Sequence, residues 1–144
     1  MHLTRFADNG LRCLMYLALH PGETSTVREI ATGMGLSEDH LVKVVQRLAQ
    51  LGYVETLRGR GGGVRLVRKP AEINIGEVVR HTEESFRIVE CFDADANTCP
   101  IAAACTLAGC LDEALRAFLA VLDRYTLEDL TKQPKRLTKL LIAS

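Results

Sequence analysis

The chain has 144 residues, 47% of them apolar, 5% aromatic and none of them Trp, which suffices for one domain, or a small domain with an appendage, around an aliphatic core. Residues 1–70 carry 10 Lys and Arg against 6 Asp and Glu, whereas residues 71–144 carry 8 against 12, so only the first half suits a polyanionic partner. The N-terminus lacks a signal segment and no apolar run is long enough to cross a bilayer, which predicts a cytoplasmic protein with no membrane contact.

Helical periodicity and capping residues predict three helices in the first third of the chain. The first covers residues 4–20 and ends at a Pro-Gly pair. Thr26 and a Glu three residues later form a capping box that opens a short helix over 27–34. After a turn at Gly35, Ser37 caps a third helix over 38–51. A short helix, a tight turn and a longer helix form a helix-turn-helix.

The third helix has the polar pattern of a recognition helix. Its N-terminal part carries Ser37, Asp39, His40 and Lys43, at the positions where such helices meet base edges and phosphates. An ordinary solvated face gives the same pattern, so the assignment depends on the segment that follows. We predict Ser37, His40 and Lys43 as DNA contacts.

A β-hairpin follows directly. Residues 54–57 and 64–67 are two short β-branched, apolar runs, joined by Arg58-Gly-Arg-Gly-Gly-Gly63. Arg58 and Arg60 at this glycine-rich tip suit phosphates or a narrow minor groove. A nucleotide-binding loop would need a following helix and a Lys-Ser/Thr pair, and neither is present. The sequence therefore predicts a mainly α fold with a small β-hairpin wing, a winged helix-turn-helix that binds double-stranded DNA.

A long helix is predicted near the C-terminus. Asn74 first caps a helix over 75–81, and after a polar loop a second helix runs from about residue 104. Its apolar positions form a heptad-like seam, which favours a homodimer on a palindromic operator over a helix packed on its own domain: Leu111, Leu115, Phe118, Leu122 and Tyr125. Thr126 caps a last short helix, and Pro134 precedes a basic, Leu-rich tail.

We expect three regions. Residues 1–82 form the winged helix-turn-helix, residues 83–109 a sensor loop that binds a metal centre, and residues 110–144 a dimerisation helix and tail. Such an order places a sensor between a DNA reader and a dimer interface.

The loop holds Cys91, Cys99 and Cys105. These thiols can be inert, form a disulfide, bind zinc or hold an iron–sulfur cluster. In a reducing cytosol, grouped cysteines are more often ligands or redox centres than bridges. Zinc sites usually show Cys-x2–4-Cys pairs, whereas the gaps here are seven and five residues, which favours a larger centre while zinc remains open. Cys13 and Cys110 lie on predicted helices and are interpreted as packing residues.

An enzyme would need an acid–base constellation. The four histidines, at positions 2, 20, 40 and 81, are scattered, and none falls in the cysteine loop. No nucleophile motif is present either, so we do not expect catalysis.

The chain resembles the iron–sulfur winged-helix repressors, above all the nitric-oxide-sensing NsrR group. The resemblance rests on the order of the parts, on Leu3-Thr-Arg-Phe-Ala-Asp-Asn-Gly-Leu-Arg12, on the wing sequence 54–63, on the three-cysteine loop and on Tyr125-Thr-Leu-Glu-Asp-Leu130. In the sibling IscR-type regulators a His two residues after the third cysteine completes the cluster. Here that residue is Leu107, so that ligation is excluded.

The resemblance implies a site and a signal. It implies a [4Fe-4S] cluster held by Cys91, Cys99, Cys105 and Asp8 of the partner subunit, although by position alone Asp8 is an ordinary acidic residue near a helix N-terminus. The implied function is a dimeric transcriptional repressor that releases operator DNA when nitric oxide reacts with the cluster. A zinc- or thiol-based redox-sensing repressor on the same scaffold is the alternative.

Overall fold

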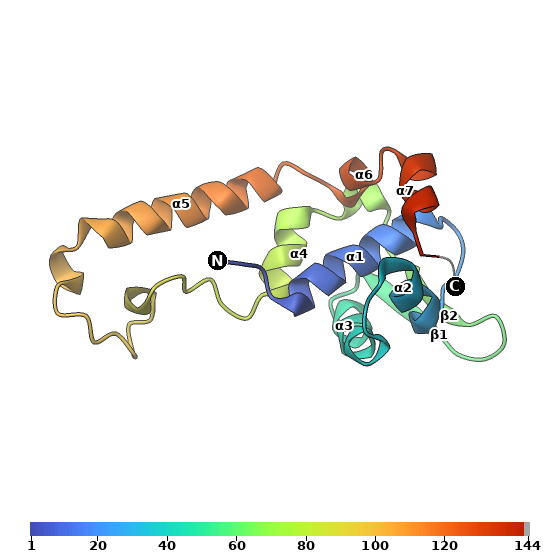
Figure 1. Ribbon diagram of the computed structural model, residues 1–144, viewed down its shortest axis with the longest axis horizontal. Coiled ribbons are helices and arrows are strands. Elements are labelled where there is room, and N and C mark those ends of the chain that lie inside the picture. Colours follow the sequence, from blue (N-terminus) through green and yellow to red (C-terminus); the bar gives the residue numbers. More distant parts are fainter. Residues whose placement is uncertain (143–144) are drawn as a thin grey trace.

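Helix α1 (Arg5–Leu19) lies at the centre of the protein, whose computed structural model describes residues 1–142. It packs against α2 (Val27–Met34), α3 (Glu38–Gln50), α4 (Ile75–Thr82) and α6 (Leu127–Leu130) (Figure 1). The Thr4 hydroxyl starts α1 by accepting a hydrogen bond from the Ala7 N–H at 3.2 Å. The core is aliphatic apart from the ring of Tyr53, as the composition predicts.

The helix-turn-helix is confirmed. The Thr26 capping box opens α2, and Gly35 ends it in the left-handed conformation at φ 64°. Ser37 occupies the N-cap position of α3, but its hydroxyl makes no capping hydrogen bond, so the predicted side-chain cap is wrong. The helix begins instead with the backbone bond from Leu41 N to Ser37 O at 3.0 Å, since Ser37 is held in extended conformation.

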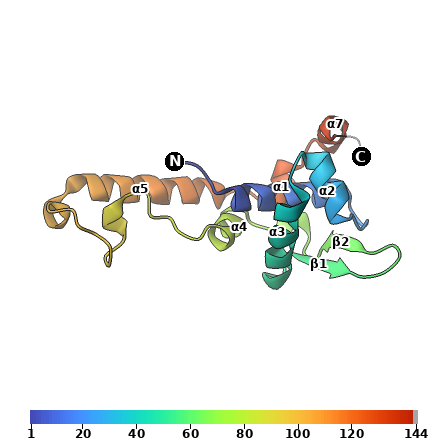
Figure 2. The same cartoon turned by 60° about the horizontal axis from the view of Figure 1, so that its bottom comes forward.

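Strands β1 (Val54–Leu57) and β2 (Gly63–Leu66) form the antiparallel wing, and β2 begins one residue earlier than predicted. Backbone hydrogen bonds of 3.0 and 2.7 Å between Ser25 and Val64 attach the hairpin to the segment before α2. Figure 2 shows the hairpin reaching out beside α3.

The chain returns to the core after α5 (Thr106–Leu122). Leu127 of α6 is fully buried, and backbone bonds of 2.9 Å run from Leu127 N to Ile73 O and from Ile75 N to Tyr125 O. Beyond it, the basic, Leu-rich tail, for which no helix was predicted, forms α7 (Pro134–Leu140), and Pro134 suits the first turn of that helix. Residues 143 and 144 of the predicted 110–144 segment lie outside the described residues.

Residues 83–122 form an arm that extends away from the rest of the molecule (Figures 1 and 2). The chain runs outward as a loop with two 3-10 turns, η2 (Glu90–Phe92) and η3 (Ala102–Ala104), and returns as helix α5. Among the described residues, α5 contains no buried side chain and contacts the body of the protein through α4. Within residues 1–142 no helix has the length and apolarity needed to cross a bilayer.

Gly63 is expected to be intolerant of a side chain. Its φ is 153°, and an added Cβ would lie 2.8 Å from Ser25 O, so the wing would have to shift away from its attachment. We expect Gly63→Ala to lower the free energy of unfolding by about 1–3 kcal/mol in urea titrations. Gly109→Ala on α5 is the control, because nothing lies within 4 Å of that position. Equal effects of the two substitutions would contradict this interpretation of the wing.

Candidate functional site

The residues predicted to read DNA all lie on the surface. Ser37, His40 and Lys43 are exposed on α3, whose opposite face is buried in the core. Arg58 and Arg60 are exposed at the wing tip. Because α3 and β1 are in contact, the exposed face of α3 and the wing form adjacent parts of one surface (Figure 2).

The wing tip closes in a way that only glycine permits. Gly59 and Gly61 have φ values of 89° and 76°, and a Cβ on Gly62 would overlap the carbonyl oxygen of Leu57. The Thr24 hydroxyl donates a hydrogen bond to Gly61 O at 3.0 Å and fixes the tip to the body. The backbone turn therefore presents the two arginines outward.

The three loop cysteines are half-buried free thiols. Cys91 lies in η2, Cys99 in the irregular segment before η3, and Cys105 at the N-cap of α5. Within residues 1–142 no three Cys, His, Asp or Glu side chains come together in a metal-binding arrangement, so the thiols are near one another in sequence without forming a closed site. A site of this kind is ordinarily completed by the metal itself, since the ligands gain their geometry on binding.

Hydrogen bonds already close the part of this loop that contains Cys91 and leads to Cys99. The Glu90 carboxylate accepts from the Thr98 N–H and, at 2.7 Å, from the Thr98 hydroxyl. These bonds lower the pKa of Glu90, so the carboxylate stays ionised at neutral pH. Asn97 Oδ1 accepts from the Cys99 N–H at 3.1 Å, and Arg87 pairs with Asp93. Cys91 and Cys99 thus each directly follow one residue of this closed polar contact, Glu90 and Thr98 respectively.

Asp8 lies on the first turn of α1, with about half of its side chain exposed, 48%. It forms an ion pair with Arg12 one turn later, with Nη2–Oδ2 3.1 Å and Nε–Oδ1 3.3 Å. Three thiols and a carboxylate are a donor set that suits iron. The residues present therefore fit the cluster chemically, with Asp8 on a surface that a second chain can reach.

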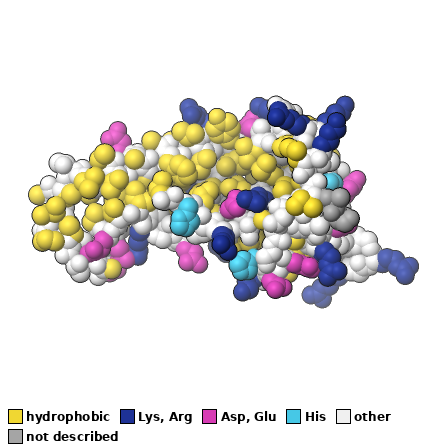
Figure 3. Space-filling view, in the orientation of Figure 1, with side chains coloured by type: hydrophobic (Ala, Val, Ile, Leu, Met, Phe, Trp, Pro, Cys, Tyr) yellow, Lys and Arg dark blue, Asp and Glu magenta, His cyan; other side chains and the backbone are white. Residues whose placement is uncertain are grey.

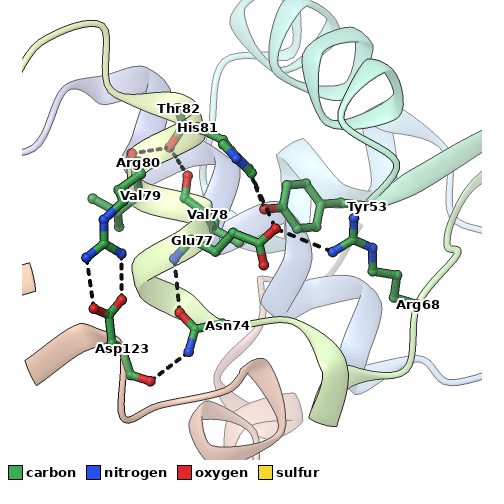
Figure 4. Close-up of polar contacts among 10 residues, drawn as sticks. All are labelled: Tyr53, Arg68, Asn74, Glu77, Val78, Val79, Arg80, His81, Thr82 and Asp123. Carbon is green, nitrogen blue, oxygen red and sulfur yellow. Dashed lines mark hydrogen bonds and ion pairs between the residues drawn. The ribbon is translucent and has the colours of Figure 1, made fainter. Parts of the chain in front are cut away.

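A network at the base of the arm connects the arm, through α4, to the reader, that is, to the helix-turn-helix and the wing (Figure 4). Arg80 of α4 makes two bonds to Asp123 at the end of α5, Nη1–Oδ1 2.5 Å and Nη2–Oδ2 2.8 Å. Asn74 Nδ2 donates to Asp123 O at 2.7 Å, and Gly76 leaves no room for a Cβ beside the Asp123 carboxylate. The end of α5 is therefore fixed on α4.

Helix α4 is in turn bonded to the reader. The hydroxyl of Tyr53, at the start of the wing, lies 2.8 Å from His81 Nδ1 on α4. Burial, with the nearby Glu77 carboxylate, raises the pKa of Tyr53 to about 12, so the phenol stays protonated. Arg68 lies over the Tyr53 ring, 4.9 Å from its centroid, and 3.6 Å from Glu77. Sequence reasoning found the Asn74 cap but missed this network, whose partners are far apart in the chain.

Comparisons with known proteins identify the family. Residues 3–133 match the Rrf2 family, described as "Iron-dependent Transcriptional regulator". The chain belongs to the Rrf2 family. It is 56% identical over 142 residues to the HTH-type transcriptional regulator NsrR of Bacillus subtilis, covering 98% of this chain and 97% of that one. It is 48% identical, with the same coverage, to the NsrR of Halalkalibacterium halodurans.

Solved structures of Rrf2-like regulators have the same fold. The T. potens IscR has a TM-score of 0.74 at 26% identity, over 92% of this chain and 87% of that one. CymR, the global cysteine regulator of B. subtilis, has a TM-score of 0.73 at 28% identity, over 92% and 97%. The winged-helix fold and the resemblance to NsrR are thereby confirmed, and this Rrf2 chain is a DNA-binding transcriptional regulator and not an enzyme.

The five cysteines are expected to divide in their reactivity. Cys13 is fully buried in α1, and burial raises the pKa of its thiol to about 12, so at pH 8 its thiolate fraction is on the order of 10⁻⁴. In native, metal-free protein, a maleimide should label the other four thiols, and Cys13 only after denaturation. Mass spectrometry of labelled peptides measures this. Labelling of Cys13 at the rate of Cys99 would contradict the buried position.

Proposed function

We propose that this Rrf2 regulator is a homodimeric repressor that binds a palindromic operator and releases it in response to nitric oxide, through a [4Fe-4S] cluster. The observation that carries the proposal is the set of three free thiols on an exposed arm whose base is fixed to the reader. Support comes from the 56% identity with a B. subtilis regulator named NsrR and from the iron dependence in the family description.

The dimer interface in this proposal is the apolar face of α5. Leu107, Phe118 and Val121 of α5 and Tyr125, three residues after the helix ends, are 36–59% exposed, and Figure 3 shows hydrophobic side chains gathered over this helix. A monomer seldom leaves so continuous an apolar surface in water. Pairing of two such helices covers it and sets two readers at the spacing of two half-sites.

The cluster ligands in this proposal are Cys91, Cys99 and Cys105, with Asp8 of the partner subunit. When bound, a [4Fe-4S] cluster supplies iron that nitric oxide can bind. A carboxylate is a harder donor than a thiolate and holds iron more weakly, so Asp8 is expected to be the first ligand to leave. Arg12 would hold the carboxylate when it is not bound to iron, in the ion pair that the structure shows.

Release of Asp8 acts on the reader through α1. The helix packs directly against α3, so a shift of α1 changes how α3 lies relative to a half-site. The arm with the three cysteines belongs to one subunit and the α1 that carries Asp8 belongs to the other. The link between cluster and Asp8 therefore spans the dimer. Only a difference in this link between two states can change operator affinity.

The test is spectroscopic. Anaerobically purified protein should show the absorption and Mössbauer spectrum of a [4Fe-4S] cluster, which bleaches on addition of nitric oxide as operator binding is lost. Asp8→Ala is expected to weaken the coupling between the spectral change and DNA release, because the link between arm and reader is gone. The control is Asp112→Ala on α5, which removes a carboxylate that also pairs with an Arg four residues later. Colourless protein that carries zinc after reconstitution would instead favour the zinc- or thiol-based repressor.

The wing makes a separate prediction. Arg60→Gln removes one exposed cation and should weaken operator binding, while the slope of log K against log salt becomes shallower by about 1. Fluorescence anisotropy across a salt series measures both. Arg136→Gln on α7 is the control for loss of an exposed charge. If both variants keep wild-type affinity and slope, Arg60 does not contact DNA.

A further inference from the structure

A shallow hollow of about 190 Å³ lies between α1 and α3, beside the proposed DNA-reading surface. Two apolar and four polar or charged residues line it: Arg5, Phe6, Asn9, His40, Lys43 and Val44. Two of these polar residues, His40 and Lys43, are already proposed to contact DNA. The other two, Arg5 and Asn9, come from α1 and have no role so far.

The hollow is positively charged. Arg5 and Lys43 bring cations to it, His40 adds a ring nitrogen donor, and no carboxylate is among the described residues that line it. The ion pairs of these two helices are made elsewhere, between Asp8 and Arg12 and between Arg28 of α2 and Glu38. Within residues 1–142 the three basic side chains of the hollow form no ion pair and are left for an anion.

Asn9 gives a second, independent indication. Its side chain is only 8% exposed, yet none of the side-chain hydrogen bonds among residues 1–142 involves its amide. Among residues 1–142 no buried polar side-chain atom lacks a partner, so the Asn9 amide keeps contact with solvent, and the hollow that Asn9 lines is where a ligand can reach it. The amide NH2 is a hydrogen-bond donor suited to an anionic oxygen.

We propose that this hollow, the α1–α3 phosphate site, binds one backbone phosphate of the operator. Arg5 and Asn9 hold it from α1, and His40 and Lys43 from α3. The inference rests on the proposed DNA-binding function and extends it. In helix-turn-helix proteins, phosphate contacts fix the register of the protein on the duplex and carry no sequence information.

The site also gives α1 a direct part in the response. Asp8, the proposed cluster ligand, lies between Arg5 and Asn9 on one turn of the helix. A movement of this turn that follows release of Asp8 therefore displaces Arg5 and Asn9, two of the four phosphate contacts, directly. It does not depend on repacking of the hydrophobic core. The sensor contact and a DNA contact share the same helical turn.

The experiment compares cluster-loaded dimers of wild type, Arg5→Gln, Asn9→Asp and the control Arg136→Gln on operator and on unrelated DNA. Arg5→Gln should lower affinity about tenfold on both DNAs and make the salt slope shallower by about 1, because a phosphate contact is sequence-independent. Asn9→Asp, nearly isosteric, should weaken binding at least as much, by placing a carboxylate beside the phosphate. Circular dichroism checks that each variant is folded.

A neutral phosphate identifies the contact. Replacing single operator phosphates with methylphosphonates should reveal one position whose neutralisation weakens wild-type binding but has little further effect on Arg5→Gln. A hollow that takes only free phosphate would show the opposite: inorganic phosphate would shift its NMR signals, while operator affinity stayed equal in Arg5→Gln and Arg136→Gln. That result, with Arg60→Gln still weakening binding, would overturn the site and leave the proposed function intact. Failure of wild type to bind any DNA would overturn both.

Discussion

The burial of α1 is the constraint on which the rest of the structure depends. One face of this helix, with Cys13, Leu14 and Leu17, is almost completely removed from water, and it contacts α2, α3, α4 and α6. Burial of aliphatic side chains is the main favourable contribution to folding, at roughly 25 cal/mol per Å². Because every helix of the reader packs on α1, a displacement of this helix cannot leave the DNA-reading surface unchanged.

Local signals predicted most of the reader from sequence. The capping boxes at Thr26 and Thr126 and the cap at Asn74 each start a helix where predicted, because a cap is a contact within three residues. The wing was found from β-branched runs and glycines. The hydroxyl of Ser37, by contrast, fails to cap, and α7 formed where only a tail was expected. Both differences depend on backbone geometry that composition does not determine.

The candidate site was less accessible to sequence reasoning. The cysteines were obvious from spacing, and Asp8 came only from a resemblance. The base of the arm, with Arg80 and Asp123, joins residues 43 positions apart and leaves no local pattern. The place of Asn9 in the hollow between α1 and α3 leaves no sequence pattern either, since it depends on how the two helices pack. What sequence could not supply was the set of contacts between elements that are distant in the chain.

The way in which the chain leaves the body of the protein at α4 and returns to it affects what happens to the fold when the arm is damaged. Both ends of the arm meet at α4. Next to them, a backbone hydrogen bond from Leu127 N to Ile73 O joins the segments before and after the arm. The arm is thus topologically an insertion into a body that contains all of the buried apolar side chains found among residues 1–142. Damage confined to the arm does not take buried surface from that body. If the proposed cluster were lost, the body would therefore remain folded and protected from the proteolysis that follows unfolding.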